Sequence, residues 1–145
     1  MRTIYFDMDG TIADLYGVNG WLDYLIAKDS TPYEIAKPLV RLSLLARYLN
    51  ELQRKGYRIG IISWLAKNSN ADFDKAVTEA KMKWLKIHLA SVQFDEINIV
   101  AYGTPKEMFS KSNTDILFDD EIPNREKWNG EAFDEKMIFE ILKAL

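Results

Sequence analysis

The sequence has no cysteine and a single histidine, His88, among its 145 residues. Disulfides and thiolate metal sites are therefore excluded, and a Cys/His zinc cluster or a Ser-His-Asp triad is poorly supplied. Oxygen atoms remain as the metal ligands that this chain offers. His88 falls within a patterned helical stretch, so we interpret it as a packing or surface side chain and not as a catalytic base.

Long apolar runs and an excess of positive charge are also missing. No stretch approaches the ~20 apolar residues of a membrane-spanning helix. The chain enters a strand pattern directly, without signal-type regions, so we expect a cytoplasmic protein with no membrane contact. Nineteen basic residues face 22 acidic ones, which gives a net charge of −3 and a pI near 5.2. From this balance we expect no extended nucleic-acid binding, whereas a small anionic substrate is compatible with it. The net charge does not indicate an oligomeric state.

The residues that are present predict one α/β domain over residues 1–145. Hydrophobic residues make up 48% of the chain, which is enough to form one core. A length of 145 residues is too short for two ordinary domains. Apolar runs of strand length alternate with helical patterns, which indicates a Rossmann-like three-layer sandwich around a mostly parallel five-stranded sheet. Residues 13–37 read as a small helical cap insertion. The predicted strands are 3–6, 57–63, 97–101, 115–120 and, at an edge, 131–133.

The helical patterns are of varied strength. A leucine stripe predicts a helix from Pro38 to about Lys55, and an apolar stripe that includes Phe73, Val77, Ala80, Trp84 and Ile87 predicts a second one over 71–89. Residues 103–107 (GTPKE) have the pattern of a capping box, which predicts a third helix start there. A short helix beginning at Pro123 and a closing helix over 136–145 complete the prediction.

The stretch TIYFDMDGT, residues 3–11, places two carboxylates at the end of a buried strand. Adjacent negative charges are costly unless a cation or hydrogen-bond donors compensate them, so Asp7 and Asp9 indicate a metal or proton-transfer site. Ligands of open parallel sheets bind at the carboxyl ends of the strands. We therefore expect Ser63, the corner at 104–106 and the pair 119–120, which follow the later strands, to lie near Asp7.

Hard oxygen ligands select a hard cation, and Mg²⁺ is the commonest that combines carboxylates with substrate phosphate oxygens. Lys106 and the backbone N–H groups after Asp7 suit a phosphoryl group. A carboxylate aimed at that phosphorus is a nucleophile. A calcium loop also uses D-x-D-G, but with Gly10 at its sixth position the loop would begin at Tyr5 and end at Tyr16, where acids are required.

Four stretches of the chain resemble, in order and spacing, the four motifs of the haloacid dehalogenase-like phosphatase superfamily. These are DMDGT at 7–11, the strand-end Ser63, Lys106 after the third strand and the Asp119–Asp120 pair after the fourth. The resemblance covers the whole chain. It implies a Mg²⁺-dependent phosphatase that passes through an aspartyl-phosphate.

The resemblance also implies roles for the acidic residues. Asp7 resembles the nucleophile and a Mg²⁺ ligand. Asp9 resembles the general acid that becomes the general base, with its backbone carbonyl on the metal. Asp119 and Asp120 resemble the pair that completes the metal site, without indicating which of the two touches the metal.

The remaining motif residues resemble those that hold the phosphate. Thr11 and Ser63 are similar to the phosphate-binding hydroxyls, and Lys106 is similar to the lysine that neutralises the nucleophile and the phosphate. True dehalogenases of the superfamily lack an acid two positions after the nucleophile. Asp9 therefore favours phosphoester hydrolysis, which needs an acid to protonate the leaving oxygen.

The substrate class is less constrained. The doubled aspartate and the small insertion resemble the 5′-nucleotidase and deoxyribonucleotidase branch, so a small phosphometabolite or a nucleoside monophosphate is the expected substrate. Tyr16, Trp21, Tyr24 and Trp64 are packing residues by default, and a stacking platform for a planar leaving group is the alternative. Arg125 is interpreted as a surface arginine. A phosphotransferase or phosphomutase, a nucleic-acid-end phosphatase and a non-catalytic binding domain on the same fold remain open.

Overall fold

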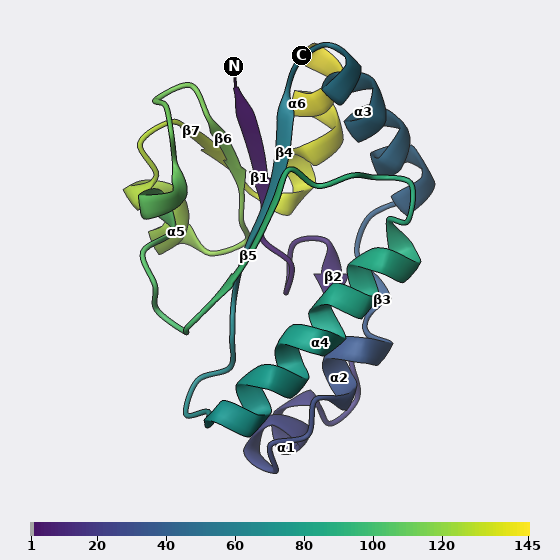
Figure 1. Cartoon of the computed structure of the whole chain (residues 1–145), viewed down its shortest axis with the longest axis vertical. Coiled ribbons are helices and arrows are strands. Elements are labelled where there is room, and N and C mark those ends of the chain that lie inside the picture. Colours follow the sequence, from purple (N-terminus) through teal and green to yellow (C-terminus); the bar gives the residue numbers. More distant parts are fainter. Residues whose placement is uncertain (1) are drawn as a thin grey trace.

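The computed structural model describes residues 2–145, and its centre is a five-stranded sheet in which every pair of neighbouring strands is parallel (Figure 1). The strand order is β5-β4-β1-β6-β7, so the first strand of the chain lies in the middle. All four residues of β1 are buried, as a run with no polar alternation requires. The predicted five-stranded α/β sheet is confirmed, including its edge strand. The strands are β1 (Thr3–Phe6), β4 (Arg58–Trp64), β5 (Glu96–Val100), β6 (Ile116–Phe118) and β7 (Glu131–Phe133).

Helices cover both faces of this sheet. One hydrophobic cluster joins α3, α4 and α6 to one face, and Ile4, Phe6 and Phe118 come from the strands. On the other face Tyr5 and Leu117 pack with Trp128, which follows α5. The result is the predicted three-layer sandwich. The helical elements of these layers are α3 (Leu42–Arg54), α4 (Ala71–His88), η1 (Lys106–Phe109), α5 (Ile122–Lys127), η2 (Glu135–Met137) and α6 (Ile138–Ala144).

A short segment between β1 and α3 stands apart from the sheet. It contains α1 (Trp21–Ile26) and α2 (Thr31–Ile35), and its two ends are joined by an antiparallel pair, β2 (Ala13–Asp14) with β3 (Lys37–Pro38). We call residues 15–36 the cap segment. It packs against the N-terminal half of α4, which extends beyond the sheet (Figure 1).

Two predicted helix starts are wrong. Pro38 lies in β3, and α3 begins four residues later at Leu42. The chain leaves the cap segment by strand pairing, and the Leu39 amide continues that pairing with a bond to the Ile12 carbonyl at 2.9 Å. At the capping-box sequence, the Thr104 hydroxyl bonds the Ala101 carbonyl at 2.7 Å and caps no helix. Only the 3₁₀ turn η1 follows, and this turn carries Lys106 into the interior.

Helix α4 follows its predicted stripe with two exceptions. Phe73, Val77, Ala80 and Trp84 are buried, but Ile87 is 62% exposed. Lys81 is 1% exposed, and the predicted stripe did not include this buried lysine. Asn70 precedes the helix as its N-cap, and its side chain accepts a hydrogen bond from the Phe73 amide.

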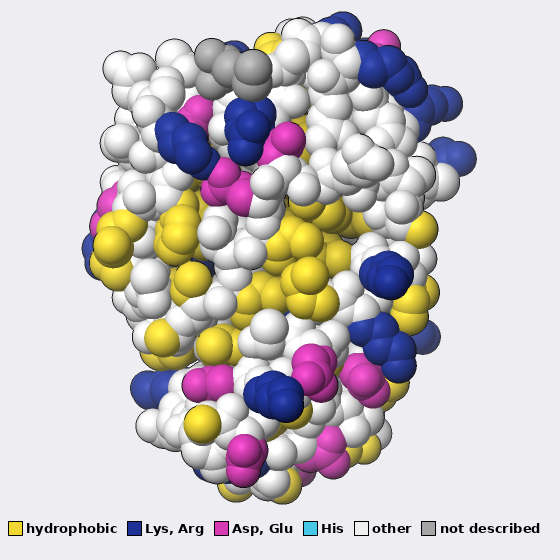
Figure 2. Space-filling view, in the orientation of Figure 1, with side chains coloured by type: hydrophobic (Ala, Val, Ile, Leu, Met, Phe, Trp, Pro, Cys, Tyr) yellow, Lys and Arg dark blue, Asp and Glu magenta, His cyan; other side chains and the backbone are white. Residues whose placement is uncertain are grey.

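The surface beside the edge strand β5 is apolar. Figure 2 shows hydrophobic side chains gathered between β5 and α4, where Met82, Leu89, Val92, Phe94 and Ile97 line a shallow groove. Among residues 2–145, no helix is long and apolar enough to cross a membrane.

Candidate active site

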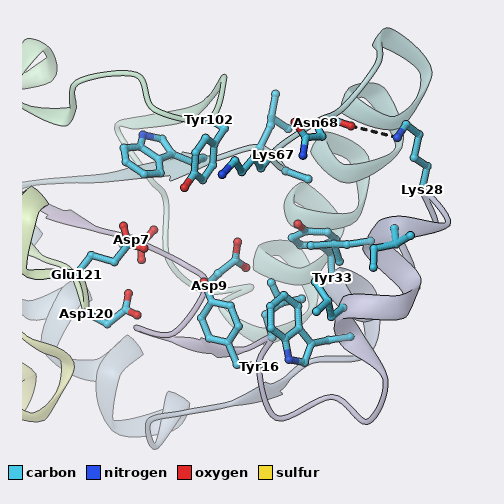
Figure 3. Close-up of a pocket in the computed structure, with 18 of the residues that line it drawn as sticks. Asp7, Asp9, Tyr16, Lys28, Tyr33, Lys67, Asn68, Tyr102, Asp120 and Glu121 are labelled. Atoms are coloured by element: carbon cyan, nitrogen blue, oxygen red, sulfur yellow. Dashed lines mark hydrogen bonds between the residues drawn. The ribbon is translucent and has the colours of Figure 1, made fainter.

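A cavity of about 540 Å³ lies at the carboxyl ends of β1 and β4, between the sheet and the cap segment. Its two ends differ in chemistry. Figure 3 shows the carboxylates of Asp7, Asp9 and Asp120 at one end, and Tyr33 and Lys28 at the other. Parallel strands bring these acidic residues together from positions more than a hundred residues apart.

Asp7 and Asp119 share one buried lysine. Lys106 Nζ donates to Asp7 Oδ1 at 2.9 Å and to Asp119 Oδ2 at 2.7 Å, and the lysine is 2% exposed. Burial acts to lower the pKa of Lys106, but Asp7 and then Asp119 outweigh burial and raise this pKa above its usual range. Lys106 is therefore a permanent positive charge beside the Asp7 carboxylate.

The turn after β1 brings Asp120 against Asp7. The Thr11 hydroxyl lies 3.1 Å from Asp7 Oδ2 and 3.2 Å from Asp120 Oδ1, so it links the two carboxylates. Gly10 has a φ of +80°, and a Cβ atom at this position would lie 2.4 Å from Asp120 Oδ2. Glycine is thus required both by the backbone and by the space that Asp120 fills.

Asp119 is held by neutral donors as well as by Lys106. Asn124 Nδ2 donates to its Oδ2 at 3.2 Å, and the Glu121 amide donates to its Oδ1 at 2.9 Å. Arg125, expected at the surface, donates to the Asp119 carbonyl at 2.9 Å. Asp119 is therefore saturated by protein donors, whereas Asp120 has no lysine or arginine partner within the described part of the chain.

The carboxylates of this cluster are short of positive charge. Burial and then the Asp7 charge raise the pKa of Asp120 to about 8 and that of Asp119 to about 6. Oxygen atoms of Asp7, Asp119 and Asp120 all lie within 4.8 Å of one another. Such an all-oxygen set fits a divalent hard cation, which would stand in place of the proton that Asp120 otherwise retains.

Asp9 has a different partner from Asp7. Lys81 Nζ, from α4, donates to Asp9 Oδ2 at 2.9 Å, to Ser63 Oγ at 2.6 Å and to the Trp64 carbonyl at 2.6 Å. Burial raises the pKa of Asp9, and Lys81 opposes that shift. Lys81 is a site residue that was not predicted from the sequence. Its spacing of four from Val77 and three from Trp84, within an apolar stripe, was the available signal.

The two predicted phosphate-binding hydroxyls are completely buried. Thr11 faces Asp7 and Asp120, and Ser63 accepts the bond from Lys81; neither side chain lines the cavity. Asp7, Asp9, Lys106 and Asp120 do line it. The structure thus brings all seven predicted site residues to one end of the sheet, but the two hydroxyls lie behind the carboxylates.

The other end of the cavity is aromatic and apolar. The rings of Tyr16 and Trp21 pack edge to face with centroids 5.0 Å apart, and Trp64 and Tyr102 do so at 5.1 Å. Tyr24, a predicted platform residue, does not line the cavity, whereas Tyr33 does. Apolar residues from the cap segment and from the loop after β4 complete this wall: Leu15, Leu22, Leu25, Ile26, Leu65 and Ala66.

Neither a protein-family model nor a curated protein matches the sequence. Several solved structures resemble the fold, among them two with a TM-score of 0.54 each. A D,D-heptose 1,7-bisphosphate phosphatase from Burkholderia thailandensis is 15% identical over 87% of this chain and 70% of its own. A chain of the Pnkp1/Rnl/Hen1 complex is 16% identical over 92% of this chain, which spans 44% of that one. The chain shares the fold of these two structures, and that fold is the Rossmann-like α/β sandwich that the sequence pattern predicts.

Proposed function

We propose that this protein is a metal-dependent phosphatase that hydrolyses a phosphomonoester through an aspartyl-phosphate on Asp7. One observation carries the proposal. Asp7 and Asp9 lie on the wall of the same cavity, and they are bonded to different lysines, Asp7 to Lys106 and Asp9 to Lys81. Two carboxylates with different environments divide the work of nucleophile and acid.

The reaction has two steps. An oxygen of Asp7 forms a bond to phosphorus while the bond from phosphorus to the leaving oxygen breaks, and Asp9 gives its proton to that oxygen. A water molecule then attacks phosphorus, Asp9 takes a proton from it, and the bond to Asp7 breaks to release phosphate. Lys106 stays charged throughout and stabilises the negative charge on the phosphoryl oxygens.

Asp7 and Asp120 are the proposed carboxylate ligands of a Mg²⁺ ion, with the Asp9 carbonyl as a further ligand. The bound ion supplies positive charge to the phosphoryl oxygens. Asp119 belongs to the same oxygen cluster, but its bonds to Lys106, Asn124 and the Glu121 amide support an indirect role. Thr11 and Ser63, predicted as phosphate ligands, are proposed to hold the carboxylates and Lys81 in place.

If Mg²⁺ binds at this site, it should raise the thermal stability of the protein. A Mg²⁺ concentration of 100 times its dissociation constant should stabilise the wild type by ~2.7 kcal/mol, because the ion binds only the folded chain. The Asp120→Asn variant should lose this stabilisation. Calorimetry with Mg²⁺ and with a chelator measures it, and Asp23→Asn, an exposed aspartate on α1, serves as the matched control. An unchanged shift in Asp120→Asn would remove Asp120 from the metal site.

The shape and chemistry of the cavity favour a nucleoside monophosphate over other small phosphometabolites. Tyr16, Trp21, Tyr33 and Trp64 line it beyond the acidic end, and aromatic rings bind planar bases by stacking. The volume of about 540 Å³ is within the usual range for small-molecule sites.

Alanine at Trp21 should raise KM for nucleoside monophosphates by about 5- to 150-fold, since each stacked base contributes ~1–3 kcal/mol. KM for sugar phosphates should change little. Steady-state kinetics on both substrate classes checks this, with Tyr24→Ala as the control aromatic outside the cavity. An equal rise for both classes would indicate lost packing and no stacking.

The function itself is tested by a panel of sugar phosphates, nucleotides and phosphorylated oligonucleotides, assayed with Mg²⁺ and with a chelator. We expect phosphate release from at least one class, dependent on Mg²⁺. Including alcohols as acceptors separates hydrolysis from phosphoryl transfer to a second substrate. No release from any member of the panel would reject the enzymatic proposal.

A further inference from the structure

Lys81 is the buried charged group that the motif pattern leaves unassigned. It extends from the middle of α4 to the carboxyl ends of β1 and β4, and it is 1% exposed. We propose that Lys81 is a positioning residue: it fixes one oxygen of Asp9 so that the other oxygen alone exchanges the proton with the leaving group. This inference rests on the proposed function, because it assigns a task to Asp9 as the proton donor.

All three N–H bonds of the Lys81 ammonium have an acceptor. Two of them go to the end of β4, to Ser63 Oγ and the Trp64 carbonyl, both at 2.6 Å. Ser63 is completely buried and belongs to a strand paired on both sides. With two bonds anchored at the end of this strand, one at a side-chain hydroxyl and one at a backbone carbonyl, the direction of the third bond is determined, and it ends at Asp9 Oδ2 at 2.9 Å.

The second oxygen of Asp9 is left for the substrate. Oδ2 accepts a hydrogen bond from the Lys81 ammonium, while Oδ1 accepts no hydrogen bond from residues 2–145. Asp9 lines the cavity, and its side chain is 17% exposed. One oxygen of the carboxylate therefore serves as the anchor and the other faces the position of the leaving group.

The environment of the ammonium explains why it stays in place. The ring of Tyr33, from the cap segment, lies with its centroid 5.2 Å from Lys81 Nζ. Tyr33 is 5% exposed and Lys81 1%, so the ring and the ammonium are buried together. An arginine has a planar fork of donors that does not match three acceptors arranged around one nitrogen atom. The site is therefore specific for lysine.

The test measures kcat/KM for substrates that differ in their need for an acid. An aryl phosphate such as p-nitrophenyl phosphate releases a stable phenolate without protonation, whereas an alkyl phosphate such as glycerol phosphate releases an alkoxide that needs a proton. In Lys81→Met, kcat/KM for the alkyl phosphate should fall about 100-fold or more, the scale of general acid catalysis. For p-nitrophenyl phosphate it should fall less than about 10-fold. Lys81→Arg should show the same pattern, and Lys86→Met, an exposed lysine of the same helix, should match wild type.

Ser63→Ala provides a second route that keeps the Lys81 charge and removes one anchor. It should reduce the alkyl phosphate rate more than the aryl phosphate rate, in the same direction as Lys81→Met. If Ser63 instead bound the phosphate itself, both rates would fall equally. Equal losses on both substrates in Lys81→Met and in Ser63→Ala would overturn the inference while leaving the phosphatase proposal intact. An inactive wild type would reject the phosphatase proposal, on which the inference rests.

Discussion

Replacing Asp7 by asparagine is expected to lower kcat by a factor on the order of 10⁴ or more, because a nucleophile and its partners act as a unit. The amide has nearly the same size as the carboxylate, but it cannot form the acyl phosphate. The fold should persist, since Lys106 keeps Asp119 as its second partner at 2.7 Å. Initial rates on the best substrate of the panel, with circular dichroism as a check of folding, give the measurement.

Asp23→Asn is the matched control, because Asp23 is exposed on α1 and outside the cavity. Its rate should equal that of wild type. Full activity in a folded Asp7→Asn protein would reject the covalent route. The metal site would then remain to explain any Mg²⁺ dependence through direct attack by water.

The second large effect is expected on stability. Lys106→Met should lower the free energy of unfolding by about 3–5 kcal/mol and abolish activity, because removing one member of a buried ion pair leaves uncompensated charge. Asp7 and Asp119 would be left without their cation in a site where both are buried. Urea unfolding with a two-state fit provides the free energy.

Lys111→Met is the comparison for this variant. Lys111 also forms an ion pair, with Glu96, but its side chain is 56% exposed. An exposed pair contributes only ~0–1 kcal/mol, so this change should be small. If Lys106→Met lowered the free energy of unfolding no more than Lys111→Met does, then Asp7 and Asp119 would not both carry charge in the folded protein.

The sequence was sufficient to predict the sheet and the carboxylates at its edge. The central strands β1 and β6 are continuous apolar runs, so their burial in a parallel sheet follows from local pattern alone. Asp7 and Asp120 each follow such a run within two residues. Their convergence was predictable because parallel strands all end at the same edge.

What the sequence could not show depends on contacts between distant segments. Pro38 has the local features of a helix start, but its pairing with Ala13 across the base of the cap segment decides its structure. Thr104 has a capping-box sequence, yet its hydroxyl bonds backwards to Ala101 while Trp64 binds its carbonyl. Tertiary contacts override local propensity in both cases.

Lys81 illustrates the same point within the site. A lysine in an apolar stripe is a visible irregularity, but its three acceptors lie 17, 18 and 72 residues away in the chain. No local rule identifies such partners. The spacing of the motifs was enough to predict their residues as a site. The lysine that donates to Asp9 could be identified only from the structure.

The most direct test of the account follows the phosphoryl group itself. The Asp9→Asn protein should still accept a phosphoryl group from p-nitrophenyl phosphate, because that leaving group needs no acid. It should then hydrolyse the aspartyl-phosphate slowly, because the general base is missing. Rapid mixing should release one equivalent of p-nitrophenolate in a burst, and acid quenching should recover the phosphoryl group on the peptide that contains Asp7. Steady phosphate release with no burst and no modified Asp7 peptide would contradict the covalent mechanism.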